Sequence, residues 1–401
     1  MMESDKLNKS DIISKRISAL TFGRASELGI PAKEAAGKEG VIVMCSGDPD
    51  FDAPMHIREA AKKAIDDGFT HYAGYPAGLS ELLEVIAMKL SRDNDIEVDP
   101  NKEILTIAGG HAGIVLTMET LIDRDDEVII PDPHFYPISR AVVYAGGKPV
   151  FVSCKEQRDF RPDPVDIEEK VTGRTKMIVL VSPNNPTGSV LTRQDLEAIS
   201  DIAKKHDLIV FSDEVYEAFV FDGRKHYSIA SFPGMKERTI TMNGLIKTYA
   251  LTGWRIAYLV ADEKYMNHLK QLHAQWTVCI NTIAQKAAIA ALTGPQDFPK
   301  KMCAEYQIRR DIMVEEFNKM PRMSCRKPWG TYYVHPNISG TGMSSLEFAK
   351  YVAREARVVF QPGSGFGDAG EGYLRTATTM QREKLREGLE RVRTAVEKLG
   401  D

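Results

Sequence analysis

The sequence predicts an α/β protein with a mainly parallel sheet covered by helices on both faces, followed by a smaller α+β domain. Short apolar runs alternate with helix-length amphipathic segments over most of the 401 residues. This is the pattern of βαβ units whose sheet is buried on both faces. Hydrophobic residues make up 43% of the chain and charged residues 27%, a composition typical of globular proteins. From about residue 290 onward the pattern changes to long charged helices with few strands.

The alternation is clearest in the middle of the chain. Apolar residues at helical spacing predict helices over Gly113–Leu121 and Arg193–His206. Apolar runs of strand length predict strands at Ile104–Ala108, Glu127–Pro131, Met177–Ser182, Leu208–Ser212 and Thr239–Met242.

The C-terminal part is predicted to combine two long amphipathic helices, Phe298–Lys319 and Gln381–Leu399, with two strands, Gly330–His335 and Tyr373–Thr376. No proline-rich or serine-rich linker precedes it, so we expect a continuous helix to join the two domains. The predicted division is an N-terminal arm with part of the small domain (1–45), a large domain (46–290) and a small C-terminal domain (291–401).

Charge, cysteines and hydropathy exclude several classes of protein. The net charge of −4 gives no electrostatic reason to expect nucleic acid or an anionic membrane as a partner. Five scattered cysteines without a CxxC pair favour neither a disulfide framework nor a zinc ribbon. No two histidines stand three or four residues apart, so no metal site is predicted. The charged first residues lack the apolar stretch of a signal peptide, and we expect a soluble, cytoplasmic protein.

Four segments that carry chemistry follow predicted strands, and ligands of open α/β sheets bind beyond the carboxyl ends of the strands. The first is the Gly109-Gly110 turn before a helix, where backbone N–H groups and the helix N-terminus favour an anion. A plain tight turn is the alternative. The second is the turn from Ser182 to Gly188, whose two prolines and two asparagines place Asn185 at a strand end.

The third segment places Asp213 and Tyr216 directly after the apolar run Leu208–Phe211. A buried aspartate is costly unless it is paired, so we expect a cationic partner for Asp213. The alternative is that Ser212 or Asp213 caps the N-terminus of a helix.

The fourth segment holds Lys247 among apolar and aromatic residues, namely Leu245, Ile246, Tyr249 and Trp254. A lysine in such surroundings loses its proton easily and can form a Schiff base. A solvated surface lysine is the alternative. The four segments together supply complementary parts of one chemical apparatus.

With these motifs the chain resembles the fold-type I, pyridoxal-phosphate-dependent aminotransferases of class I/II. The resemblance implies a mixed seven-stranded sheet, pyridoxal 5′-phosphate as cofactor, and transfer of an amino group between an L-α-amino acid and a 2-oxo acid by a ping-pong mechanism. It extends from about Ile13 to the last helix, with six motifs in the family's order: Gly47-Asp48-Pro49-Asp50-Phe51, Gly109-Gly110, Asn185-Pro186-Thr187-Gly188, Asp213-Glu214-Val215-Tyr216, Lys247 with Gly253-Trp254-Arg255, and Tyr373-Leu374-Arg375.

The resemblance also implies roles for single residues. Lys247 would hold the cofactor as an aldimine and move the proton at the substrate Cα, while Asp213 would pair with the pyridine nitrogen. Asn185 and Tyr216 would bond to the phenolic oxygen of the cofactor. The remaining implied roles are phosphate binding by Gly109, Gly110 and Arg255, ring stacking by Phe135, and binding of the substrate α-carboxylate by Arg375 beside Gly47 and Asn185.

Tyr72 matches a tyrosine that reaches the phosphate of the neighbouring subunit, so the resemblance implies a homodimer with shared active sites; an ordinary core tyrosine is the alternative. Four departures from the family stand out, one of which is His111 at a position where the family often has glutamine. Gly244 and Ile246 occupy positions where the family usually has hydroxyl residues, one of which contacts the phosphate. Ala257 replaces a common glycine.

Other reactions on the same fold stay open. A β-lyase, a decarboxylase or a synthase would use the same cofactor chemistry, and a non-catalytic cofactor-binding regulator is a more remote alternative. The regulators of this kind carry a DNA-binding domain, whereas about 45 residues precede Gly47 here, without a helix-turn-helix pattern. For the substrate we expect a neutral or broad range of α-amino acids, with the segment Ile13–Leu28 as an apolar wall.

Overall fold

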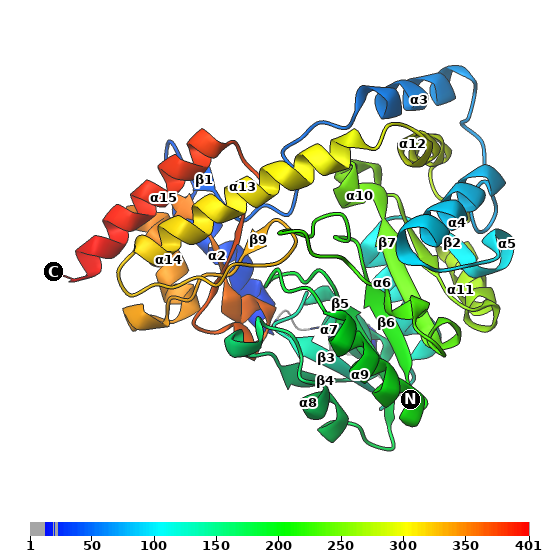
Figure 1. Ribbon diagram of the computed structural model, residues 1–401, viewed down its shortest axis with the longest axis horizontal. Coiled ribbons are helices and arrows are strands. Elements are labelled where there is room, and N and C mark those ends of the chain that lie inside the picture. The colour runs from blue at the N-terminus through cyan, green and yellow to red at the C-terminus, as the bar shows by residue number, and fades with distance from the viewer. Residues whose placement is uncertain (1–12, 19, 21–22, 401) are drawn as a thin grey trace, which may run out of the picture.

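The computed structural model describes residues 13–18, 20 and 23–400, and a seven-stranded sheet forms its centre (Figure 1). Strand β8 is antiparallel to both of its neighbours, and all other neighbouring strands are parallel. The predicted mixed, mainly parallel sheet is therefore confirmed, and the bounds of each strand predicted for this sheet lie within two residues of those observed. In spatial order the strands are β2 (Ile104–Ile107), β8 (Ala257–Val260), β7 (Thr239–Gly244), β6 (Ile209–Asp213), β5 (Thr175–Val181), β3 (Glu127–Asp132) and β4 (Lys148–Ser153).

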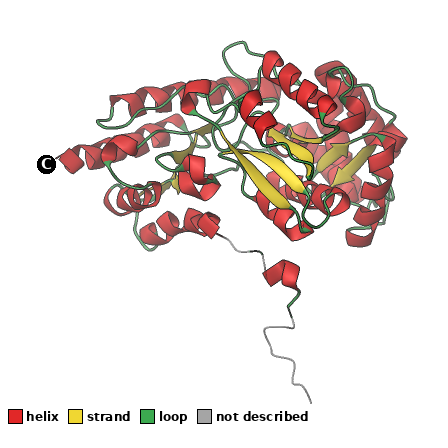
Figure 2. Cartoon of the chain, turned by 90° about the horizontal axis from the view of Figure 1, so that it is seen from below, coloured by secondary structure: helices red, strands yellow, loops and turns green. Residues whose placement is uncertain are grey.

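Helices cover both faces of this sheet, as Figure 2 shows. Alternate residues of β5 enter different apolar cores: Met177 and Val179 pack on one face, and Ile178 and Leu180 on the other. This explains why the strands appear as continuous apolar runs in the sequence. The helices of this part are α3 (Met55–Asp66), α4 (Ser80–Asn94), α5 (Pro100–Glu103), α6 (Gly110–Leu121), α7 (Pro137–Ala145), α8 (Pro164–Glu169), α9 (Arg193–Lys205), α10 (Leu245–Thr248), α11 (Glu263–Trp276) and α12 (Thr282–Thr293).

A second apolar core lies around a three-stranded antiparallel sheet, in the order β11–β12–β9, and a pair of parallel strands, β1 and β10. The elements of this part are α2 (Ile30–Ala35), β1 (Ile42–Val43), α13 (Asp297–Lys319), β9 (Tyr333–Val334), α14 (Ser345–Glu355), β10 (Val358–Val359), β11 (Gln361–Pro362), β12 (Leu374–Ala377) and α15 (Arg382–Glu397). Helix α1 (Lys15–Ser18) has no buried residue and contacts α7 of the large-sheet part. Nine 3₁₀ helices complete the described chain: Gly23–Gly29, Glu156–Arg158, Ile229–Ser231, Lys236–Arg238, Thr252–Trp254, Ser339–Thr341, Gly363–Phe366, Asp368–Gly370 and Lys398–Gly400.

Helix α13, drawn in yellow in Figure 1, runs from the end of α12 to the side of α14 and α15. Its first half places Met302 and Tyr306 in the core of the large sheet, and its second half places Met313 and Phe317 in the second core. One helix therefore connects the two cores. The division of the chain at residue 290 stays a prediction.

The predicted strand Gly330–His335 shortens to Tyr333–Val334. Its first residues bond instead to loops of the large sheet: the Gly330 N–H donates to the Gly188 carbonyl, and the Thr331 N–H to the Phe219 carbonyl. Thr331 also has a positive φ of 60°, which no strand residue adopts. Within the described residues, no helix is both long and apolar enough to cross a membrane.

Candidate active site

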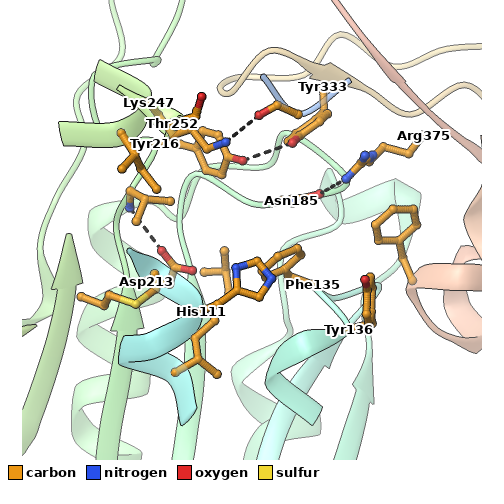
Figure 3. A pocket seen from close by; sticks show the side chains of 18 of the residues that line it. His111, Phe135, Tyr136, Asn185, Asp213, Tyr216, Lys247, Thr252, Tyr333 and Arg375 are labelled. Atoms are coloured by element: carbon orange, nitrogen blue, oxygen red, sulfur yellow. Dashed lines mark hydrogen bonds between the residues drawn. The ribbon is translucent and has the colours of Figure 1, made fainter. Parts of the chain in front are cut away.

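A cavity of about 430 Å³ lies between the carboxyl ends of the large-sheet strands and the three-stranded sheet (Figure 3). The strands β5, β6 and β7 deliver side chains to it from one side, and β9, β11 and β12 from the other. It brings together nine of the residues predicted from the sequence: Gly47, Gly110, Phe135, Asn185, Asp213, Tyr216, Lys247, Arg255 and Arg375.

Lys247 lies in α10, the short helix that follows β7, and its amine points into the cavity (Figure 3). The Nζ atom donates to the Gly47 carbonyl at 2.5 Å, and no described carboxylate lies within ion-pair distance. Burial lowers the pKa of Lys247 because a charged ammonium is poorly solvated there. The alternative of a solvated surface lysine is therefore wrong.

Tyr333 is a site residue that the sequence analysis did not identify. Its hydroxyl lies 3.2 Å from that of Tyr216, and burial together with Tyr333 raises the pKa of the Tyr216 phenol. A Cβ atom on Gly47 would lie 2.7 Å from the Tyr333 hydroxyl, so this position has room only for glycine. The neighbouring Tyr332 donates to the Gly47 carbonyl at 2.7 Å. The only signal in the sequence was the aromatic pair within a predicted strand.

Asp213 is the last residue of β6, and its side chain is buried. It accepts one hydrogen bond, from the Val215 backbone N–H at 3.2 Å, and no described lysine, arginine or histidine lies within ion-pair distance. Burial, with a smaller contribution from the Glu214 carboxylate, raises the pKa of Asp213 to about 7. The cation expected from the sequence is thus not supplied by the described chain. No helix begins at this point, so the capping alternative is wrong.

An anion site is formed where β2 runs into α6. Gly109 has a φ of +88°, which glycine adopts without strain, and a Cβ atom there would lie 2.3 Å from Nη2 of Arg255. The Arg255 guanidinium therefore lies against the bare backbone at the N-terminus of α6. Arg255 donates to the Thr252 carbonyl at 2.9 Å but has no ion-pair partner among the described carboxylates. A free guanidinium and a helix N-terminus together suit a phosphate group.

The glycine at position 244 and the alanine at position 257, two of the departures from the family, are in contact. Gly244 and Ala257 are directly opposite one another in the pairing of β7 with β8. A Cβ atom on Gly244 would lie only 2.8 Å from the Cβ atom of Ala257. A hydroxyl side chain at position 244 is therefore excluded by the methyl group of Ala257.

Arg375 reaches the cavity from β12. Its Nη1 atom donates to the Asn185 side-chain oxygen at 3.1 Å, and its Nη2 atom to the Cys45 carbonyl at 3.0 Å. Its guanidinium lies 4.4 Å from the ring centre of Tyr333 and 4.7 Å from that of Phe366. No described carboxylate pairs with it, so this buried charge is available to an anionic ligand.

His111 and Phe135 form one wall of the cavity, with their rings in edge-to-face contact at 5.3 Å. Burial, and then the charges of Arg255 and Lys247, lower the pKa of His111, so the imidazole is neutral near pH 7. Leu28 and Phe366 add apolar surface. Leu28 is the part of the expected Ile13–Leu28 wall that lines the cavity; residues 19, 21 and 22 lie outside the described residues.

Tyr72 does not line this cavity. It is 82% exposed and lies in a separate groove with the segment Cys279–Ile283. The alternative of a core tyrosine is therefore wrong, and the contact of Tyr72 with a partner subunit stays a prediction.

Glu214, Glu217 and His226 bring potential metal-binding atoms within 4.8 Å of one another behind the site. Their carboxylates are already occupied, because Glu214 accepts from His226 and two serines, while Glu217 accepts from Lys89 and Asn94. The group is an ion-pair and hydrogen-bond network.

Known proteins share both this sequence and this fold. The family profile described as "Aminotransferase class I and II" matches residues 39–392. An aromatic-amino-acid aminotransferase of Thermococcus litoralis and an aspartate aminotransferase of Pyrococcus abyssi are each 44% identical over 360 residues, 89% of this chain and 92% of theirs.

Solved structures give the same result. An aromatic aminotransferase from Pyrococcus horikoshii superposes with a TM-score of 0.88 at 41% identity, covering 92% of this chain and 99% of that one. An aspartate aminotransferase from Thermus thermophilus with maleate superposes with a TM-score of 0.89 at 34% identity, covering 96% of this chain and 99% of that one. The chain therefore belongs to the aminotransferase class I and II family and is an aminotransferase.

Proposed function

We propose that the protein is a cytoplasmic, homodimeric, pyridoxal-phosphate-dependent aminotransferase that moves an amino group between an L-α-amino acid and a 2-oxo acid by a ping-pong mechanism. One observation carries this proposal. A buried carboxylate without a cation, Asp213, and a buried amine without a carboxylate, Lys247, line the same cavity. Buried ionisable groups of this kind destabilise a fold unless a ligand supplies their missing partners, so they indicate a functional site.

The residues present fit pyridoxal 5′-phosphate. A protonated pyridine nitrogen is the cation that Asp213 lacks, and a phosphate is the anion that Arg255 and the N-terminus of α6 lack. Phe135 offers an aromatic face beside them. When bound, the cofactor supplies an electron sink for negative charge at the substrate Cα and carries the amino group between the half-reactions.

Lys247 and Arg375 perform the two tasks that the chain itself must provide. Burial lowers the pKa of Lys247 and so makes its amine easier to deprotonate; the neutral amine can accept the proton from the substrate Cα and return it. Arg375 binds the α-carboxylate, which the amino acid and the 2-oxo acid share. One binding site therefore serves both half-reactions. Asn185 accepts from Arg375 and so connects the carboxylate site to the cofactor side.

The lining of the cavity favours a neutral or aromatic substrate side chain. Lys247, Arg255 and Arg375 are the cations that line it within the described chain, and each has a role in the proposal. The pKa of His111 is lowered by burial and by the charges of Arg255 and Lys247, which disfavours a further cation at this position. Leu28, Phe366 and Tyr136 add apolar and aromatic surface. A dicarboxylate substrate would need a cation from elsewhere, so we expect a higher kcat/KM for phenylalanine than for aspartate.

The homodimer is supported by the position of Tyr72. It is 82% exposed in a groove of about 490 Å³, and Tyr75, at 66%, is also exposed nearby in the sequence. In the proposed dimer, Tyr72 of one subunit contributes to the cofactor site of the other.

Co-expression of Lys247→Ala and Tyr72→Ala chains tests the shared site. The mixture should regain activity that neither variant shows in full, because a hybrid dimer has one site in which both Lys247 and Tyr72 are present. Activity no higher than the sum of the two separate variants would contradict the shared site.

The reaction type is tested by following products from the wild-type enzyme loaded with pyridoxal phosphate. Transamination without an acceptor stops after one equivalent of 2-oxo acid per active site, and it continues only when an acceptor 2-oxo acid is present. Release of ammonia and pyruvate without an acceptor would favour a β-lyase, and release of carbon dioxide a decarboxylase.

A further inference from the structure

Gln361 stands directly opposite Arg375 in the pairing of β11 with β12, and both side chains line the cavity. We propose that Gln361 is a positioning residue for Arg375, whose Nε–H donates to the side-chain carbonyl of Gln361. The inference rests on the proposed function, because it assigns Arg375 to the α-carboxylate of the substrate. It concerns the orientation of the guanidinium rather than its charge.

Two buried atoms carry the argument. Oε1 of Gln361 and Nε of Arg375 are both inaccessible to solvent, and neither has a hydrogen-bond partner in the described chain. One is an acceptor and the other a donor. Since water cannot reach either atom, a substrate in the cavity cannot reach it either, and the partner must come from the protein. Buried polar atoms are rarely left unpaired, because each costs about 1–3 kcal/mol.

The two residues are placed so that each can satisfy the other. Directly opposed side chains of an antiparallel pair lie on the same face, with Cβ atoms about 5 Å apart. The glutamine side chain has rotatable bonds that can turn its oxygen towards Nε.

The proposed bond would leave Arg375 with two unpaired N–H groups for the substrate. Of its five N–H groups, one on Nη1 donates to Asn185 and one on Nη2 to the Cys45 carbonyl. With Nε–H assigned to Gln361, two N–H groups remain, one on each Nη atom. These are enough for two hydrogen bonds to one carboxylate.

The aromatic rings beside Arg375 limit the tilt of its guanidinium but not its rotation within the guanidinium plane. Tyr333 and Phe366 lie 4.4 and 4.7 Å from the guanidinium carbon and limit its tilt. Rotation within the guanidinium plane is restricted by hydrogen bonds, and the two that the structure shows, to Asn185 and Cys45, both act on the Nη atoms. A bond at Nε would add a third fixed point and hold the free N–H groups towards the substrate.

This role predicts a particular kinetic pattern. Every substrate of both half-reactions carries the same α-carboxylate, so loss of the bond should weaken all of them alike. A residue that contacts the substrate side chain would instead change some substrates and not others. The proton transfer by Lys247 should be unaffected.

The test compares Gln361→Met, which keeps the length of the side chain and removes the acceptor, with wild-type holoenzyme. Gln361→Leu is the second variant, and Gln194→Met, at an exposed helix position, is the control. KM and kcat are measured for alanine, phenylalanine and a 2-oxo acid. We expect KM to rise about tenfold for all three, with kcat within twofold of wild type and the control unchanged.

A second measurement needs no turnover. The Kd of 3-phenylpropionate, a carboxylate without an amino group, should rise about tenfold in both Gln361 variants by calorimetry. An unchanged Kd, a KM change confined to one substrate, or a fall in kcat would overturn the inference. An inactive wild-type enzyme that still binds the carboxylate would refute the proposed function alone, and the Kd comparison would still decide the role of Gln361.

Discussion

Two sheets supply the cavity, and we name its two ends by the sheet that carries the residues. The first end comprises Asp213, Lys247 and Gly110, which follow or end strands of the large sheet. The second end comprises Tyr333, Gln361 and Arg375 on the three-stranded sheet. The first group has few partners: Asp213 accepts one backbone hydrogen bond, and Lys247 donates to one carbonyl.

Arg375 at the second end is held by two hydrogen bonds and two aromatic rings. The difference separates two tasks. The groups proposed to bind a cofactor and exchange protons are left incompletely paired, with shifted pKa values, whereas the group proposed to recognise a carboxylate is rigidly held. Substitutions at the two ends should therefore fail in different ways.

The largest expected effect is at Lys247. Lys247→Ala removes the amine that we propose binds the cofactor and moves the proton, and kcat should fall by about 10⁴-fold or more. Steady-state assays with saturating pyridoxal phosphate measure it, with Lys300→Ala at an exposed position as the control. Turnover close to that of wild type in Lys247→Ala would refute the assigned role.

Asp213→Asn should lower kcat by about 10²–10³-fold, because it removes the charge proposed to face the pyridine nitrogen. The same substitution should make the cofactor-free protein more stable above the pKa of Asp213. The pKa of Asp213 is raised from 3.8 to about 7 in the fold, so the cofactor-free folded state binds more protons than the unfolded chain between these values. The cofactor-free wild type therefore loses stability as pH rises from about 4 through about 7.

Thermal denaturation of the cofactor-free proteins checks this prediction. At pH 8, Asp213→Asn should unfold at a higher temperature than wild type, and the difference should shrink towards pH 4. A variant that is less stable than wild type by the same margin at both pH values would show that Asp213 supports the fold rather than the function.

At the rigid end, Arg375→Ala should raise KM for the amino acid and for the 2-oxo acid by about 100-fold each. The KM values of Arg375→Lys should lie between those of Arg375→Ala and wild type. Lysine keeps the positive charge but loses the planar guanidinium that donates two hydrogen bonds to one carboxylate. Arg193→Ala, which removes an exposed helix ion pair, is the control. If only one of the two substrates were affected, Arg375 would not be the common carboxylate site.

The smallest effect concerns the cross-strand pair behind Lys247. Gly244→Ser should destabilise the protein by about 1–3 kcal/mol, because its Cβ atom would meet Ala257 at 2.8 Å. Adding Ala257→Gly should restore most of this loss, and denaturant unfolding of the single and double variants measures the coupling. Strictly additive effects would contradict the contact.

The two ends also differ in how far the sequence could predict them. Four residues at the cavity could be predicted because each belongs to a short segment that ends or follows a strand. The local pattern and the resemblance were enough to place Asp213, Lys247, Asn185 and Arg255. Tyr333 and Gln361 could not be placed, because their positions depend on pairing between β9, β11 and β12.

The same limit applied to the strand predicted at Gly330–His335. It lost its first half because Gly330 and Thr331 bond to loops more than 100 residues earlier in the chain, which no local periodicity reveals. The compensation between Gly244 and Ala257 was hidden in the same way: both departures were visible in the sequence, and only the register of β7 and β8 connects them.

The most direct test of the central claim is an absorption titration of the wild-type protein loaded with pyridoxal phosphate. Single amino acids are added in turn, followed by a 2-oxo acid, with Lys247→Ala in parallel. We predict that the absorption band of the bound cofactor disappears with certain amino acids and returns with the 2-oxo acid, and that Lys247→Ala does not complete this cycle. A wild-type protein that binds no cofactor, or whose band never changes reversibly, would contradict amino-group transfer at this cavity.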